Sequence, residues 1–331
     1  MRRLLNPKVL GTIAVVLIVM VGSTMLLPVP LPAISLPAET IGHIGPFRLT
    51  NTFLHTLVAD VVILLLAFFG TRNMKLVPSG LQNVLEWMIE ALYNLAEGVT
   101  GDAARRYFPI VATIFFLVLV SNWMELIPGV DSVGWMETHA GFDHYPVEEA
   151  GPVLYLWGKD AYMVDGYGEA GAEDEAHSEE GVKEHHDIHT LPIIDGTPRG
   201  VVVPWLRASA TDLNFTLALA LIVMVMVQVY GFRAQGAKYF SKFFNTKDGP
   251  MNLFISVIEL ISEFGKVLSF TFRLFGNIFG GQVLLFVSAF LITLIFPTAF
   301  FGIEFFVGAI QAFVFFILAL VFFNMATQAH H

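Results

Sequence analysis

Six apolar runs, each long enough to cross a lipid bilayer, limit what this 331-residue chain can fold into. They occupy residues 9–27, 53–70, 108–127, 213–230, 253–296 and 298–325. About 20 apolar residues in a helix span the hydrocarbon core, and 55% of this chain is hydrophobic. The sequence therefore predicts an all-α polytopic membrane protein with five to six membrane helices. The absence of cysteine excludes a disulfide, a thiol nucleophile and a thiolate metal site.

Charge is distributed unevenly along the chain. Residues 131–200 contain 16 acidic and 3 basic residues, whereas the rest of the sequence is slightly basic. The basic residues gather at 2–8, 72–106 and 233–247, which fall on one side of the membrane if each run crosses once. Because positively charged loops stay in the cytoplasm, we expect the acidic 131–200 loop to be extracytoplasmic.

These patterns divide the chain into five segments. Residues 1–50 hold a Pro-rich stretch and the 9–27 run, which is either a signal peptide or a retained anchor. Residues 51–130 hold the first membrane helices and, at 81–97, an amphipathic helix whose apolar residues recur at helical spacing. The acidic loop at 131–200 is followed by a membrane helix and a basic loop at 201–250, and then by a C-terminal hairpin at 251–331.

The C-terminal hairpin begins with an unusually long helix. Residues 252–290 form one pattern without proline, and a straight helix of that length would measure about 58 Å. The hydrocarbon core is only about 30 Å thick, so we expect this helix to tilt or bend. Pro297 interrupts the pattern, and the chain returns through 298–327.

Polar residues follow one face of the long helix, at steps of three or four residues. They are Glu259, Ser262, Lys266, Ser269, Arg273 and Asn277. Arg273 lies deep in the apolar run, where a guanidinium costs from about 3 to more than 10 kcal/mol. Arginine cannot avoid this cost by losing its proton. Such a residue predicts a function that uses its charge.

The return helix offers polar partners for this face. Glu304 and Gln311 are seven residues apart and share one face of their helix. In an antiparallel hairpin, Glu304 should approach the level of Gln282, and Gln311 that of Asn277 or Arg273. These residues would form a polar path toward the arginine. The small-xxx-small pair Gly276 and Gly280 favours a close contact with another helix.

Four stretches resemble subunit a of the F-type ATP synthase membrane sector. The run FRLFGN at 272–277 is the most specific of them. The others are SNWMELIPG at 121–129, TDLNFT at 211–216 and QAFVF at 311–315. The resemblance covers roughly residues 50–130 and 205–327. It implies a proton-translocating stator subunit in an energy-transducing membrane, the bacterial plasma or inner membrane, with no cofactor, metal or nucleic acid.

The resemblance also implies partners and roles for residues. The C-terminal hairpin would face a ring of c subunits, with b-type peripheral stalk subunits, the F1 ATPase head and membrane lipids as further partners. Arg273 would face the ring carboxylates and separate two aqueous half-channels. The outer half-channel would contain Asn277, Gln282, Glu304, Gln311, Asp212 and Asn214. The cytoplasmic half-channel would contain Glu259, Ser262, Lys266 and Ser269.

This chain departs from the family pattern at one pair of positions. Gln282 and Glu304 stand where many relatives carry a glutamate and a histidine, so a relay of two titratable residues is incomplete here. Asp212 is also expected to cap a helix. Asp60 and Glu125 are weaker candidates for the polar path.

Two other classes of function compete with this interpretation. The acidic loop holds His139, His144, His177, His185, His186 and His189. His185 and His189 have a spacing that can bind a metal, so the chain could be a divalent-metal transporter. A cationic Arg273 inside the spans argues against it, because it would repel a dication. A subunit that served only as a structural scaffold would not need polar residues that recur along one face of its long helix.

Overall fold

The computed structural model describes residues 7–27, 29, 34–137, 143–150, 153–156, 162–163, 193–194, 197–236, 238–239 and 250–328. Within these residues, five helical stretches are long and apolar enough to cross a membrane. They are Asn51–Thr71, Leu81–Glu125, Leu213–Gln235, Phe254–Leu291 and Ile295–Thr327. This confirms the prediction of a helical membrane protein that crosses the bilayer several times.

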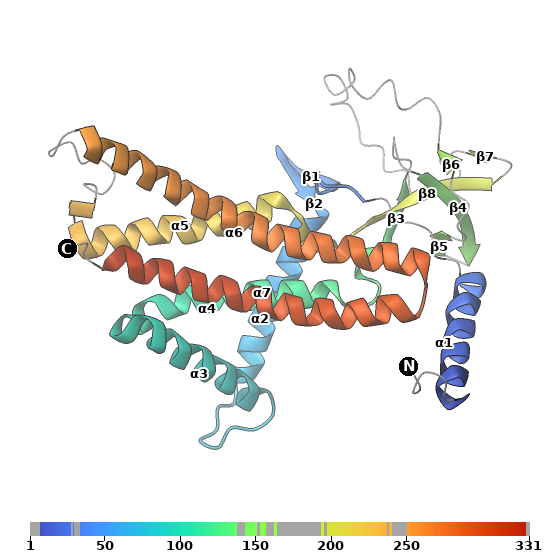
Figure 1. Cartoon of the computed structure of the whole chain (residues 1–331), viewed down its shortest axis with the longest axis horizontal. Coiled ribbons are helices and arrows are strands. Elements are labelled where there is room, and N and C mark those ends of the chain that lie inside the picture. Colours follow the sequence, from blue (N-terminus) through green and yellow to red (C-terminus); the bar gives the residue numbers. More distant parts are fainter. Residues whose placement is uncertain are drawn as a thin grey trace. The chain divides into compact units, whose positions relative to one another are not determined.

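The helices follow the predicted runs closely (Figure 1). They are α1 (Pro7–Leu26), α2 (Asn51–Thr71), α3 (Leu81–Thr100), α4 (Ala104–Glu125), α5 (Leu213–Gln235), α6 (Pro250–Leu291) and α7 (Ile295–Thr327). Short 3-10 turns precede or follow several of them: η1 (Gly101–Ala103), η2 (Val130–Ser132) and η6 (Ser209–Thr211). The predicted amphipathic helix is α3, which buries Leu92 and Ala96 in the core and exposes Trp87.

Strands, which the sequence did not predict, occupy parts of the acidic segment at 131–200. They are β3 (Gly134–Glu137), β4 (Asp143–Ala150), β5 (Val153–Leu156), β6 (Tyr162–Met163), β7 (Ile193–Ile194) and β8 (Thr197–Pro204), all paired antiparallel. The sheet has the order β3-β8-β4-β5, with β6 beside β4 and β7 beside β8. A separate hairpin, β1 (Thr40–Ile44) and β2 (Phe47–Thr50), precedes α2. The acidic segment therefore contains a folded sheet.

Contacts divide the chain into two compact units. The tip unit comprises Met1–Ile41, Pro128–Leu206 and Gly280–Glu304, and the bundle unit comprises Gly42–Ile127, Arg207–Phe279 and Phe305–His331. The tip unit thus holds the sheet, α1 and the turn of the C-terminal hairpin. In that unit the Thr293 hydroxyl donates to the Leu27 carbonyl over 3.0 Å.

The bundle unit owes its cohesion to aromatic packing among α4, α5, α6 and α7. Phe270 meets Phe315 edge to face with ring centroids 4.6 Å apart, and Tyr230 packs 4.9 Å from Tyr107. Helices in lipid associate through such close packing and through hydrogen bonds, because lipid itself is apolar. On α4, the Trp123 indole donates to the Phe305 carbonyl of α7 over 3.1 Å.

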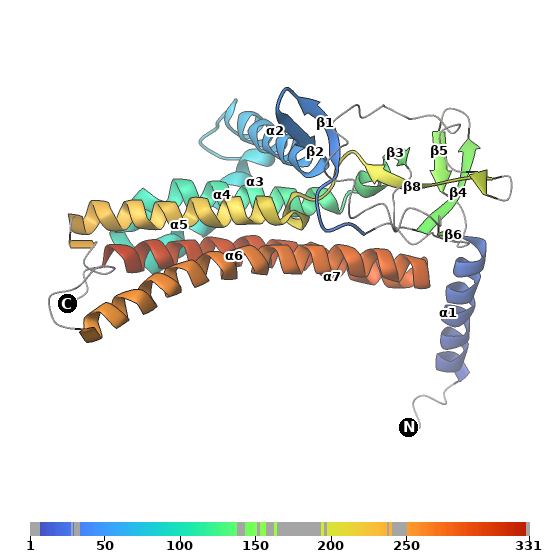
Figure 2. The same cartoon turned by 90° about the horizontal axis from the view of Figure 1, so that it is seen from above.

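The C-terminal hairpin has the predicted architecture but turns earlier than expected. Helices α6 and α7 lie side by side near the turn that joins them, and the N-terminal part of α6 curves away from α7 (Figure 2). Its 42 residues would extend about 63 Å if straight, about twice the thickness of the hydrocarbon core, so α6 is too long to cross a bilayer upright along its whole length. The chain turns at 292–294, not at Pro297, which lies in the first turn of α7. Proline is tolerated there because a first-turn N–H has no partner within the helix.

Candidate functional site

Arg273 lies on an uncovered side of α6. Leu274 and Ile278 mark the side that packs into the core, and both are almost fully buried. At about 100° per residue, Arg273 lies roughly a quarter turn from Leu274, and its side chain is exposed. Among the residues that the structure describes, none forms a hydrogen bond or ion pair with its guanidinium. Because hydrocarbon solvates charge poorly, a cation in an apolar run is costly unless water or a group beyond these described contacts meets it.

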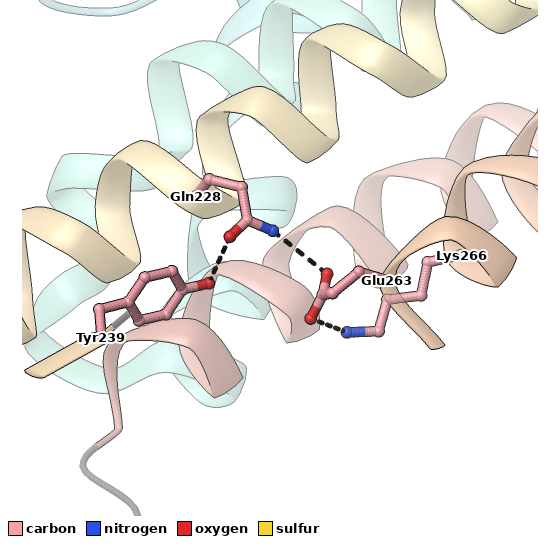
Figure 3. A network of polar contacts seen from close by, with 4 residues as sticks. All are labelled: Gln228, Tyr239, Glu263 and Lys266. Atoms are coloured by element: carbon pink, nitrogen blue, oxygen red, sulfur yellow. Dashed lines mark hydrogen bonds and ion pairs between the residues drawn. The ribbon is translucent and has the colours of Figure 1, made fainter. Parts of the chain in front are cut away.

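Lys266, two turns before Arg273, is neutralised within the chain. Its amine lies 2.7 Å from Glu263 Oε1 and 5.3 Å from the centre of the Phe322 ring. The other Glu263 oxygen accepts from Gln228 of α5 over 3.2 Å (Figure 3). Lysine and glutamate are both mostly buried, with 20% and 9% of their side chains exposed. Of the two cations on α6, Arg273 is therefore the one whose charge is available to a partner, within the part of the chain that the structure describes.

The Glu263 network continues to Tyr239, which follows the end of α5. Tyr239 donates its hydroxyl proton to Gln228 Oε1 over 2.8 Å (Figure 3). The Tyr239 ring packs against Gly231, where any side chain would overlap it. A cavity of about 590 Å³ borders Gln228 and Glu263 between α5 and α6, and its remaining wall is apolar. The buried carboxylate of Glu263 thus borders open space at one side of the bundle.

Small residues surround Arg273 on α6. A Cβ added to Gly265 or Gly276 would meet no atom within 4 Å among the described residues, and Ser262 and Ser269 are exposed. Among the described residues, therefore, none makes the close contact predicted at Gly276. Small residues on this side of α6 would allow another helix to approach closely.

The predicted pairing of Asn277 with the return helix is confirmed. Asn277 Nδ2 donates to Gln311 Oε1 over 2.7 Å. Gln311 is almost fully buried, and its Nε2 has no hydrogen-bond partner among the described residues. This amide pair therefore keeps an N–H donor for an acceptor oxygen, such as that of a water or a carboxylate, one turn after Arg273.

In the tip unit, Glu304 packs where the sequence predicted it, beside the Gln282 turn of α6. Its carboxylate occupies the space that a side chain at Gly281 would fill. Glu304 is 7% exposed, and its Oε1 has no hydrogen-bond partner among the described residues. Gln282 is buried and donates from Nε2 to Asp131 Oδ2 over 2.9 Å. A second carboxylate, which the sequence did not indicate, therefore accompanies this pair of positions.

Asp212 has a clear structural role at the start of α5. Its Oδ1 accepts from the Asn214 backbone N–H over 2.9 Å, and its Oδ2 accepts from the Thr52 hydroxyl over 3.0 Å. The predicted N-cap is thus confirmed, and it links α5 to α2. Beside it, His55 Nδ1 and the Ser209 hydroxyl are 2.9 Å apart in the buried interior. The side chain of Asn214 itself is exposed.

We expect Asp212→Ala to lower the thermal stability of the solubilised complex, because a lost N-cap costs about 1 kcal/mol. Asp212→Asn should keep most of that stability, because its amide oxygen still accepts from the Asn214 N–H. Thermal unfolding of the two variants side by side measures the difference. Equal loss of stability in both would show that the charge, rather than the cap, matters.

The remaining predicted residues stay separate from these contacts. Asp60 is exposed on α2, and Glu125 is buried at the end of α4. Glu259 is half-buried on α6. Of the loop histidines, only the backbone of His144 belongs to the described residues, and the proposed metal pair His185 and His189 lies outside them. Within the described part, no three potential metal ligands gather.

Sequence reasoning missed the partners that come from other elements. Gln228 and Tyr239 gave no periodic signal, since each is a single polar residue beside an apolar run. Asp131 was one of many acidic residues in its loop. Glu263 does show a signal, because it follows Glu259 by one turn and precedes Lys266 by three residues.

Comparison with known proteins identifies the family of this chain. Residues 53–324 match the family described as ATP synthase A chain. ATP synthase subunit a of Helicobacter hepaticus is 31% identical over 277 residues, which cover 82% of this chain and 87% of that protein. The Moorella thermoacetica subunit a is 24% identical over 295 residues, covering 89% and 98%. The chain therefore belongs to the family of subunit a of F-type ATP synthases, a component of their membrane sector.

Proposed function

We propose that this subunit guides protons between the two sides of the membrane and a ring of c subunits, so that proton flow turns the ring and drives ATP synthesis. The observation that carries the proposal is Arg273, an exposed cation without a partner among the described residues, on a side of α6 lined by small residues. A rotating ring of helices with one carboxylate each is a partner that fits this side.

Arg273 would act on the ring carboxylate in two ways. At 4 Å and an effective dielectric of about 20, a guanidinium attracts a carboxylate by about 4 kcal/mol, which stabilises its deprotonated form. The same charge repels a proton that would otherwise cross directly. The membrane potential supplies about 2.3 kcal/mol per charge per 100 mV, and a direct leak would dissipate that work.

The outer half-channel would lead through residues near the turn of the hairpin. By their order along α6 and α7, Gln282 and Glu304 lie nearer the outside than Asn277 and Gln311. Glu304 is the titratable member, and its location beside Gly281 supports this role. Asp212 and Asn214 would also belong to this side, as the resemblance implies, and Asp212 would hold α5 through its cap.

The cytoplasmic half-channel would follow the polar face toward Glu259. Ser262, Lys266 and Ser269 belong to it by sequence, and the structure adds Glu263, which borders the cavity between α5 and α6. A buried carboxylate that borders open space can accept a proton released from the ring. Lys266 would keep Glu263 ionised until that proton arrives.

We expect Glu263→Gln to lower ATP synthesis in membrane vesicles by about tenfold, less than the ~100-fold typical for loss of an acid–base group, because water can carry part of the flow. The double variant Glu263→Gln with Lys266→Met removes the stranded lysine charge. It should remain impaired if Glu263 carries protons. Recovery in the double variant would instead assign Glu263 only the neutralisation of Lys266.

Co-purification tests the proposed function as a whole. Affinity capture of this subunit from solubilised membranes should retain an oligomeric c-ring, b-type stalk subunits and a soluble head with ATPase activity. After removal of the head, the membrane sector should conduct protons in sodium-free buffer. Capture of this chain without any ring would overturn the assignment.

A further inference from the structure

The hydrogen bond between Gln282 and Asp131 brings a titratable residue to the position where this chain departs from the family pattern. Gln282 cannot titrate, yet its buried amide donates to Asp131 Oδ2 over 2.9 Å. Asp131 belongs to η2, the first turn of the extracytoplasmic insertion, and both residues lie in the tip unit. An amide N–H donates most strongly to an ionised carboxylate, so this contact favours the ionised form of Asp131, the form that can take up a proton.

Glu304 lies next to the same turn of α6. Its carboxylate packs over Gly281, the residue before Gln282, and would be displaced by any side chain there. Glu304 is 7% exposed, and its Oε1 lacks a hydrogen-bond partner among the described residues. One buried carboxylate thus has an oxygen available to receive a proton, and the adjacent amide holds a second carboxylate.

We propose that Asp131 is the second acid–base residue of the outer half-channel and supplies protons to Glu304. The inference rests on the proposed function of this subunit as a proton guide. Asp131 takes a proton from an external hydronium ion and releases water. It then passes that proton through water to the Glu304 carboxylate and returns to its ionised form. Gln282 only positions Asp131, and its amide gains and loses no proton.

The sheet of the tip unit explains how a loop residue can be held in place for this task. Gly129 has a left-handed φ of 99°, and its carbonyl accepts from Ser132 and Val133, both over 3.1 Å. Trp205 then donates to the Val133 carbonyl over 3.0 Å, where the pairing of β3 with β8 begins. The turn that carries Asp131 is therefore fixed to the sheet, which gives the extracytoplasmic insertion a function.

Moving the carboxylate from residue 131 to residue 282, its hydrogen-bond partner, tests this inference. Asp131→Asn keeps an oxygen that can accept from Gln282 but cannot titrate. We expect it to lower proton conduction by the head-stripped membrane sector about tenfold, less than the ~100-fold typical of a lost acid–base group, because water partly replaces it. Adding Gln282→Glu to that variant restores a carboxylate at the same pair, and we expect it to recover most of the conduction.

Controls separate this inference from the proposed function. Asp102→Asn, at an exposed aspartate on η1, should conduct like the unchanged protein. Arg273→Ala, assayed in parallel for coupled ATP synthesis, tests the proposed function itself. Normal conduction by Asp131→Asn alongside a defective Arg273→Ala would overturn the role of Asp131 and leave the proposed function standing. Failure of Gln282→Glu to rescue a well-assembled Asp131→Asn complex would also overturn it.

Discussion

Replacement of Arg273 by alanine should abolish ATP synthesis driven by a proton gradient, while the complex still assembles. The side chain is exposed and bonds to no described residue, so its removal leaves the bundle core unchanged. The ring carboxylate would lose about 4 kcal/mol of stabilisation in its ionised form, close to a thousandfold in the ionisation equilibrium. ATP synthesis in inverted membrane vesicles measures the loss.

Arg273→Lys is the informative companion to the alanine variant. Lysine keeps the charge but loses the planar fork that matches a carboxylate, and it gives up its proton more readily in apolar surroundings. We therefore expect little or no ATP synthesis from it. The lysine variant should nevertheless block passive proton leakage better than the alanine variant. Near-normal coupled synthesis by Arg273→Ala would remove the proposed mechanism.

Glu304→Gln should produce the second largest effect. The glutamine keeps the shape of the side chain over Gly281 but cannot carry a proton, and loss of a positioned acid–base group typically costs about 100-fold or more in rate. We expect proton conduction by the head-stripped membrane sector to fall by about that factor. Glu304→Asp, which keeps a carboxylate one methylene shorter, should retain measurable conduction.

Gly281→Ala provides a matched test of the same site. The added methyl group would overlap the Glu304 carboxylate and force it to move, without changing any titratable group. If the single variants Gly281→Ala and Glu304→Gln both lose most of their proton conduction, then conduction depends on the position of the Glu304 carboxylate. Full conduction in Glu304→Gln would exclude Glu304 from the proton path.

Much of this arrangement follows from local periodicity. The apolar runs predict the helices because a membrane helix must satisfy its own backbone and expose apolar side chains. The seven-residue spacing of Glu304 and Gln311 predicts that both face α6, and the contacts of Gln311 with Asn277 and of Glu304 with Gly281 confirm it. These features depend on residues within one helix or on an antiparallel pair joined by a short turn.

Other features depend on contacts that periodicity does not encode. The hairpin turns at 292–294, and Pro297 lies in the first turn of α7, where proline is tolerated, instead of ending α6. Asp131 reaches Gln282 across 151 residues of sequence, and Gln228 reaches Glu263 across 35. Strand β3, which begins at residue 134, pairs with β8 near residue 203. The acidic composition of this segment gives no sign of that pairing.

A cysteine cross-link tests the central claim most directly, because the chain contains no native cysteine. Ser269→Cys lies one turn before Arg273 on its exposed side, and Phe264→Cys lies about 140° further around α6 and is also exposed. Each is combined with a cysteine next to the ring carboxylate and oxidised in native membranes. We predict a disulfide from residue 269 to the ring and none from residue 264. Cross-linking from residue 264 alone would contradict a rotor facing Arg273.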